Sequence, residues 1–196
     1  MKEIWFWSDL HLGHENMYRF TNYDGSACRP WSADEIFEAE EVMIQRYNEL
    51  VKPGDTVYNL GDVGSKTDRI SYFMNRLNQS RRILIMGNHD NKIGAKFLGK
   101  YFSEIRGCYN LENYIMSHIP ISSGSKGRFK RNIHGHTHGN IITVDNNGKI
   151  PDVWYRNVCV EVTDYRPINF SEIREETEKL IDSGKIILPK RGDRVV

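Results

Sequence analysis

The sequence has no apolar run long enough to cross a membrane. A membrane-spanning helix needs about 20 consecutive, mostly apolar residues, and hydrophobic residues make up only 39% of the 196 positions without forming such a run. The amino terminus leads directly into a strand-like segment at residues 3–8 and shows no charged, apolar and small-residue signal pattern. We therefore expect a soluble cytoplasmic protein without a membrane partner.

The sequence also has few cysteines and a small net charge. Cys28, Cys108 and Cys159 are odd in number, lie far apart and form no Cys-x-x-Cys pair, which indicates reduced thiols and argues against sulfur ligation of a metal. The 27 Lys and Arg residues against 26 Asp and Glu residues give a net charge of +1. This balance provides no overall attraction to nucleic acid or to an anionic membrane.

The chain also lacks a linker, an internal repeat and a low-complexity tract. Its length favours one domain over two. We expect a single domain over residues 1–196, of which the last dozen form a solvated tail.

Histidine is present in a pattern that indicates a metal site. All seven histidines lie in or beside short blocks that also hold Asp, Asn, Ser or Gly, whereas histidines used for packing would be scattered. Each block follows an apolar, strand-like run, as expected when a layered sheet gathers functional groups at the carboxyl ends of its strands. The blocks are Asp9-Leu10-His11 with His14, Gly61-Asp62, Gly87-Asn88-His89-Asp90, Ser117-His118 and His134-Gly135-His136-Thr137-His138.

Two helices are expected between the first three strands. Ser32 and Glu35 form a capping box that opens a helix ending before Pro53. A second helix is expected over residues 68–77. The order strand, helix, strand, helix, strand makes two right-handed crossovers and predicts a largely parallel first sheet.

The rest of the chain predicts a second sheet. Its extended segments are closely spaced, which favours antiparallel neighbours. We expect a mostly antiparallel sheet packed face to face with the first, and a final amphipathic helix over residues 171–182. A short helix at 95–98 precedes extended segments near 102–106, 112–117, 131–135, 140–144 and 156–162.

The five blocks, in this order, resemble those of the calcineurin-like metallophosphoesterases. The resemblance covers about residues 2–162, and five blocks in fixed order are far more specific than any one alone. It implies an α/β protein with a four-layer α/β/β/α sandwich, two packed mixed sheets and a metal site at the carboxyl ends of the strands. It also implies hydrolysis of phosphodiesters or phosphomonoesters by a dinuclear metal centre.

The same resemblance assigns seven ligands to two divalent metal ions. A carboxylate between two dications offsets their repulsion, and imidazole mixed with carboxylate and amide oxygen suits Mn, Fe, Co, Ni or Zn better than Ca or Mg, with Mn first among them. The expected nucleophile is a hydroxide that bridges the two ions and attacks phosphorus in line with the leaving group. The ligands are Asp9, His11 and His138 for one ion, Asn88, His118 and His136 for the other, and Asp62 for both.

His89 directly follows the expected ligand Asn88. The resemblance implies that His89 contacts the substrate, where it assists the leaving oxygen or steadies the phosphoryl group. Asp90 could accept a hydrogen bond from the His89 imidazole, raise its pKa and hold its orientation. Capping of the turn is the alternative role for Asp90.

Four further features have two interpretations each. His14 could touch the phosphate or hydrogen-bond a metal ligand, or only shape its loop. Arg29 could grip a phosphate, or lie on a solvated loop. His134 could pack in the core or support a ligand. The basic run at residues 126–131 could contact a polyanion, or be a solvated loop.

The leading hypothesis is a small phosphoesterase without a cap domain. An open site favours phosphodiesters or broad specificity. Two alternatives remain: a nuclease acting on nucleic acid, and a non-catalytic scaffold that retains the fold.

Overall fold

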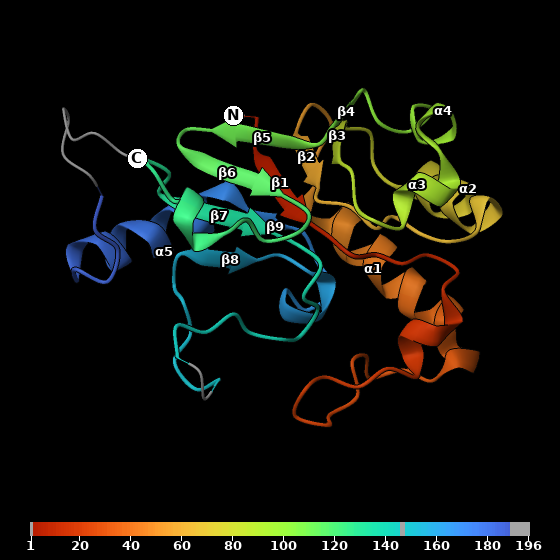
Figure 1. The fold of residues 1–196 in the computed structure, drawn as a ribbon. Coiled ribbons are helices and arrows are strands. Elements are labelled where there is room, and N and C mark those ends of the chain that lie inside the picture. The colour runs from red at the N-terminus through yellow and green to blue at the C-terminus, as the bar shows by residue number, and fades with distance from the viewer. Residues whose placement is uncertain (1, 146–147, 189–196) are drawn as a thin grey trace.

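Two β-sheets lie at the centre of the molecule (Figure 1). The computed structural model of the chain describes residues 2–145 and 148–188. None of the helices in this part of the chain combines the length and apolar character that a membrane span requires. Most of the expected tail, residues 189–196, lies outside the described residues.

The first sheet is largely parallel, as predicted. Its strand order is β4-β3-β2-β1-β9, in which the first four strands are parallel and β9 is antiparallel to β1. The expected segment at 102–106 joins this sheet as β4, whereas the two-residue strand β9 was not predicted. The strands are β1 (Ile4–Trp7), β2 (Thr56–Asn59), β3 (Arg81–Ile85), β4 (Glu104–Arg106) and β9 (Ile168–Asn169).

The second sheet is mixed, and the expectation that it is mostly antiparallel was wrong. Its order is β5-β6-β7-β8, and only β5 and β6 are antiparallel. The connections at 118–130 and 135–154 carry the chain back to the same end of the sheet, so β6, β7 and β8 run parallel. The segment at 140–144 forms only an isolated bridge between Thr143 and Pro151. The strands are β5 (Cys108–Leu111), β6 (Tyr114–Ser117), β7 (Arg131–His134) and β8 (Tyr155–Asn157).

Four of the five α-helices in the described residues begin and end close to their predicted positions, whereas α3 was not predicted. The capping box of Ser32 and Glu35 is present and leads through a short 3-10 turn at Ala33–Glu35 into the first helix. A second capping box, of Asn169 and Glu172, opens the last helix. The helices are α1 (Ile36–Leu50), α2 (Thr67–Arg76), α3 (Asp90–Ile93), α4 (Ala95–Leu98) and α5 (Phe170–Asp182).

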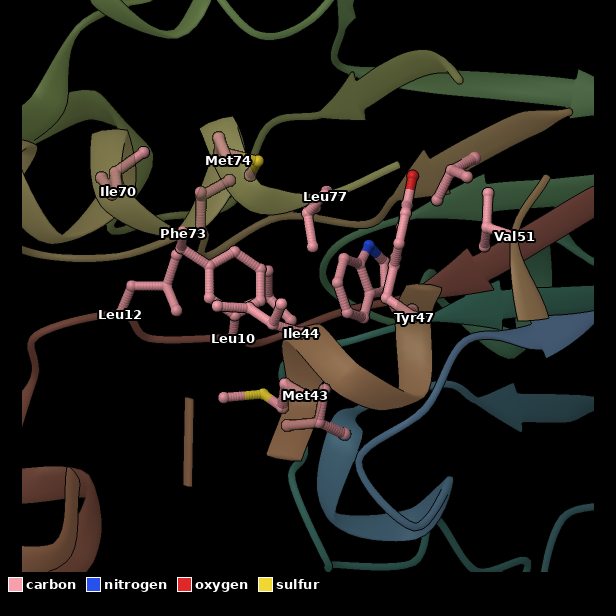
Figure 2. Close-up of a cluster of buried hydrophobic side chains, with 14 of the residues drawn as sticks. Leu10, Leu12, Met43, Ile44, Tyr47, Val51, Ile70, Phe73, Met74 and Leu77 are labelled. Atoms are coloured by element: carbon pink, nitrogen blue, oxygen red, sulfur yellow. The ribbon is translucent and has the colours of Figure 1, made fainter. Parts of the chain in front are cut away.

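A buried cluster joins α1 and α2 to one face of the first sheet (Figure 2). The Trp7 ring of β1 lies 5.0 Å from Tyr47 of α1 and 6.0 Å from Phe73 of α2, measured between ring centroids. Burial of each such side chain contributes about 1.5–3 kcal/mol. Leu10 and Leu12, fully buried in the same cluster, anchor the loop that carries Asp9 and His11. The core therefore fixes the position of this loop.

The other face of the first sheet packs against the second sheet and α5. Phe6 of β1 contacts Tyr58 of β2 and Phe170 of α5, with ring centroids 5.4 and 5.5 Å apart. Tyr114 of β6 lies edge-on to Phe170 at 5.1 Å. The chain is thus a mixed α/β fold with two packed mixed sheets, as expected.

Candidate metal centre

The loops that follow β1 and β2 are joined by backbone hydrogen bonds. The amides of Asp9 and His11 donate to the carbonyls of Gly61 and Asp62, each at 3.0 Å. On the second sheet, the amide of Gly135 donates to the carbonyl of His118 at 3.0 Å. Because these strands are parallel within each sheet, their carboxyl ends meet at one edge. Two groups there could hold a metal ion: Asp9 with His11 and His138, and Asp62 with His118 and His136.

Each of the two carboxylates accepts a hydrogen bond from a backbone amide at one oxygen and presents the other oxygen to imidazole nitrogens. Oδ2 of Asp9 accepts from the amide of His136 at 2.9 Å and from the Cys159 thiol at 3.2 Å, whereas Oδ1 is buried without a hydrogen-bond partner. Oδ1 of Asp62 accepts from the amide of His89 at 2.8 Å. A buried, unpaired carboxylate oxygen is costly. A cation bound to this oxygen would offset the free-energy cost of its burial.

The second oxygen of each carboxylate, Oδ1 of Asp9 and Oδ2 of Asp62, faces imidazole nitrogens at distances typical of ligands that share an ion. Nε2 of His11 lies 3.7 Å from Oδ1 of Asp9 and 3.6 Å from Oδ2 of Asp62. Nε2 of His118 lies 3.4 Å from the same Asp62 oxygen, and Nε2 of His138 lies 3.9 Å from Asp9 Oδ1. Ligands about 2.1 Å from one ion lie about 3–4 Å from each other. The residues present therefore fit divalent metals, with Asp62 placed between the two groups.

The His118 ring is oriented by a backbone carbonyl. Its Nδ1 donates to the carbonyl of Leu60 at 2.7 Å, and its Nε2 lies 2.9 Å from Oδ1 of Asn88. Burial lowers the pKa of His118, but the Asp62 and Asp9 carboxylates more than offset this and raise it to about 9. The same two carboxylates would attract a cation bound beside His118.

Opposing effects also act on the carboxylates. Burial raises the pKa of Asp9, but the neighbouring imidazoles of His11, His118 and His138 outweigh burial and hold it well below its usual range. The pKa of Asp62 is also lowered, because its contact with His118 outweighs burial. Both groups are therefore anionic at neutral pH, as metal ligands must be.

Most of the predicted ligands lie on left-handed backbone, which non-glycine residues rarely adopt. This conformation costs roughly 1–3 kcal/mol per residue and is found mostly at functional sites. It turns successive side chains toward the centre of the site while Leu10 and Leu12 point into the core. The residues and their φ values are Asp9 (60°), His11 (50°), Asp62 (54°), His136 (71°) and His138 (50°).

Gly87 and Gly135 allow the loops to approach these carboxylates closely. A Cβ at Gly87 would collide with the Asp62 carboxylate, and one at Gly135 would collide with Ser8 and the Asp9 carboxylate. Neither glycine has a positive φ, so each is needed because it has no side chain and not for its backbone conformation.

Comparison with known proteins identifies the family of this chain. A family model described as calcineurin-like phosphoesterase matches residues 2–188. The chain belongs to the calcineurin-like phosphoesterase family. It is 32% identical over 192 residues to an uncharacterized protein from Methanocaldococcus jannaschii, which covers 95% of this chain and 96% of that protein. It is also 30% identical over 112 residues to the gene 66 protein of Mycobacterium phage L5, across 52% of this chain and 49% of the phage protein.

A solved structure shares the fold of this calcineurin-like phosphoesterase. It is the crystal structure of a protein of unknown function from Aquifex aeolicus, with a TM-score of 0.62 and 24% identity, covering 90% of this chain and all of that one (100%). The resemblance inferred from the five blocks is confirmed by the family match. Family membership implies metal-dependent hydrolysis of phosphoesters.

In this calcineurin-like phosphoesterase, His89 lies beside the metal groups but Asp90 does not orient it. The His89 side chain is 34% exposed, and its Nε2 lies 4.0 Å from Oδ2 of Asp62. The buried Asp90 carboxylate accepts instead from the backbone amides of Gly87, Asp62 and Val63, at 2.8–3.0 Å. The catalytic role expected for Asp90 is therefore corrected to the alternative, capping: it joins the loops after β2 and β3.

His14 extends the row of imidazoles toward the surface. Its ring centroid lies 5.4 Å from His11 and 5.7 Å from His89, and its Nδ1 is buried without a hydrogen-bond partner. Burial, followed by the neighbouring imidazoles, lowers the pKa of His14 to about 4. The ring is therefore neutral at pH 7 and lies where it could reach a substrate. Its role in substrate binding stays a prediction.

Both interpretations of Arg29 were wrong, because this side chain is completely buried. Its Nη2 donates to the carbonyl of Asp9 at 2.7 Å and its Nη1 to the carbonyl of Leu10 at 3.1 Å. Its Nε pairs with Glu161 Oε1 at 2.9 Å. The left-handed turn at Asp9 directs these carbonyls inward, where they need donors, and the guanidinium fork supplies several in fixed geometry. Arg29 holds the ligand loop and does not contact solvent or substrate.

Glu161 is a site residue that the sequence did not reveal. Its Oε1 also lies 3.3 Å from Nδ1 of His138, and its charge raises the pKa of that imidazole against the effect of burial. A carboxylate behind a ligand imidazole fixes the ring and makes it a better donor to metal. The segment Val160-Glu161-Val162 contains none of the His, Asn or Gly that marked the other blocks.

A third group of possible ligands shares residues with this network. Cys28, His138 and Glu161 lie close enough to surround an ion. The buried positive charge of Arg29, however, already neutralises Glu161 at 2.9 Å. A dication beside this guanidinium would be repelled. We therefore treat Glu161 as a support for His138.

His134 and the basic run lie away from the centre. His134 is buried, with its Nδ1 2.8 Å from the carbonyl of Gly135 and its ring against Tyr155, so it packs in the core. Three cations of the run at 126–131 pair with acidic side chains. These pairs are Lys126 with Asp152 at 3.1 Å, Lys130 with Glu178 at 3.2 Å and Arg131 with Glu176 at 3.1 Å.

Proposed function

We propose that this chain is a dinuclear metal-dependent phosphoesterase that hydrolyses phosphodiesters, with phosphomonoesters as a second substrate class. The observation that carries the proposal is the position of Asp62. Its Oδ2 lies 3.6 Å from the imidazole of His11 and 3.4 Å from that of His118, so one carboxylate faces both metal groups. Such a bridging carboxylate offsets the repulsion between two dications.

The seven predicted ligands would hold two ions, of which Mn is our first choice. When bound, the ions supply Lewis-acid chemistry at the water nucleophile and at the phosphoryl oxygens. The first ion would be held by Asp9, His11 and His138, and the second by Asn88, His118 and His136, with Asp62 shared.

His89 is the proposed acid, and His14 a proposed contact for the phosphoryl group. The amide of His89 is tied to Asp62 Oδ1, which fixes the backbone beneath the imidazole while the ring faces the opening of the site. His89 Nε2 would give a proton or a hydrogen bond to the leaving oxygen. The neutral His14 ring, next to His89, would steady a non-bridging oxygen.

The open site supports phosphodiesters over nucleic acid or a scaffold role. Asn88 and His136 are both exposed, so a phosphorus carrying two substituents can approach. The paired cations of the basic run leave little free positive charge for a polyanion. All seven ligand positions are occupied by metal-binding residue types, which a scaffold does not need.

The decisive experiment compares metal content and turnover in two variants. Purified protein is loaded with Mn²⁺, analysed for metal, and assayed with bis(p-nitrophenyl) phosphate. Asp62→Asn is expected to lose metal and activity together, whereas His89→Ala keeps both metals and turns over about 10²–10⁴-fold more slowly. Asp68→Asn, an exposed position on α2, is the matched control for Asp62→Asn and should behave as wild type.

Three outcomes would count against the proposal. Wild-type protein with fewer than two metals per chain and no turnover would exclude the dinuclear enzyme. Unchanged turnover in His89→Ala across several substrates would remove the role of His89. Hydrolysis of oligonucleotides in preference to the small diester would favour the nuclease.

A further inference from the structure

A groove of about 410 Å³ opens next to the predicted ligands Asn88 and His118. Its walls come from the loop after β3, the amino-terminal end of β5 and the loop after β6. Because Asn88 and His118 themselves line it, the groove is continuous with the candidate metal centre.

The groove is largely apolar and, apart from the predicted ligand His118, has no charged side chain in its lining. Met86, Ile119 and Ile121 contribute its apolar surface, and none of the described residues that line it is Lys, Arg, Asp or Glu. Ile119 is 53% exposed. Exposed apolar surface in a concave place beside polar groups is typical of a small-molecule site.

We infer that this groove binds the second ester substituent of the substrate, the one that is not the leaving group, and that it selects an uncharged, apolar group. The inference rests on the proposed phosphodiesterase function. A phosphorus held near Asn88 and His118 has a substituent within reach of this groove, because both residues line it. Apolar area on the substituent would be removed from water against Met86, Ile119 and Ile121. A charged substituent would find no Lys, Arg, Asp or Glu side chain there to pair with.

The first test compares two diesters with the same leaving group. Bis(p-nitrophenyl) phosphate carries an aryl second substituent and methyl p-nitrophenyl phosphate a methyl group. Ile119→Ser is expected to lower kcat/KM for the aryl diester about tenfold, chiefly through KM, and to leave the methyl diester nearly unchanged. Ile187→Ser, at an 87% exposed position near the carboxyl terminus, is the matched control.

The second test uses the thiol in the groove. Cys108 is exposed and lines the groove, whereas Cys28 and Cys159 are buried, so a bulky maleimide should label Cys108 selectively. Labelling is expected to slow hydrolysis of the aryl diester more than that of the methyl diester, and diphenyl phosphate should protect the thiol. In the Cys108→Ser variant the reagent should change neither rate, which assigns the effect of labelling to Cys108.

The outcomes separate this inference from the function on which it rests. If the wild type hydrolyses both diesters but Ile119→Ser and the maleimide change their rates equally or not at all, the groove does not bind the substituent. If the Mn-loaded wild type hydrolyses neither diester, the proposed function itself is wrong.

Discussion

At the scale of single residues, the sequence predicted the groups that face the candidate metal positions but not the groups behind them. Short blocks at the ends of strands predict Asp9, His11 and Asp62, because metal binding needs particular residue types on a local turn. Arg29 and Glu161 are 132 positions apart, and only the folded chain brings them together. A buried Arg has no sequence signature that separates it from an arginine on a solvated loop.

The Arg29–Glu161 pair predicts a selective loss of metal. Glu161→Gln removes the charge that faces Nδ1 of His138, so the affinity for Mn²⁺ should fall about 10–100-fold at one of the two metal positions and stay nearly unchanged at the other. Isothermal titration calorimetry on metal-free protein measures the Mn²⁺ affinity of both positions. The control Glu176→Gln disrupts another Arg–Glu pair, with Arg131, and should leave both affinities intact. Equal weakening at both positions would argue for a general loss of structure.

At the scale of elements, local patterns predicted the helices and the first sheet well. The capping box of Ser32 and Glu35 marks where the first helix begins, and two helical crossovers require parallel strands. The direction of β7 and β8 was not predictable, because hydrophobic alternation is the same in either direction and the long loops permit both. β9, at Ile168–Asn169, is too short to show any periodicity.

The pairing of β1 with β2 should depend on pH through Asp55. Its carboxylate accepts from the amides of Glu3 and Lys52 and from the Trp5 indole, each at 3.0 Å. Burial raises the pKa of Asp55, but these three hydrogen bonds outweigh it and the net shift is downward. A lowered pKa means that the carboxylate stabilises the fold above its unfolded value of about 3.9 and that this stability is lost as pH falls through the folded value.

Asp55→Asn is therefore expected to be about 1–2 kcal/mol less stable than wild type at pH 7 and to show a smaller difference at pH 3. Urea unfolding at the two pH values measures this. Asp182→Asn, exposed at the end of α5, is the control. A constant difference between pH 7 and pH 3 would show that the ionised form of Asp55 has no special role.

At the scale of the whole molecule, the candidate metal centre lies on the seam between the two sheets. Loops that follow strands of the first sheet supply four of the predicted ligands, and loops that follow strands of the second supply three. Bound metal would therefore connect the sheets as well as the ligands. The four are Asp9, His11, Asp62 and Asn88, and the three are His118, His136 and His138.

Metal should consequently stabilise the entire fold. At a free metal concentration of about 100 times Kd, one site adds about 2.7 kcal/mol, which for a chain of this size raises Tm by about 5–10 °C. Calorimetry with chelator and then with excess Mn²⁺ measures the shift. Asp62→Asn should show little or none of it. A wild-type Tm that does not respond to Mn²⁺ would contradict binding at this seam.

At the left-handed turns of the predicted ligands, the residue that best suits the backbone differs from the residue that can bind a metal ion. Asp9 and Asp62 occupy backbone conformations, with φ of 60° and 54°, that glycine adopts without steric cost. Glycine there would also remove two buried negative charges from the same small volume. Selection for folding alone would thus favour glycine at both positions, whereas selection for hydrolysis keeps aspartate. In the proposed enzyme, the two aspartates would therefore be kept at a cost in stability that glycine would avoid.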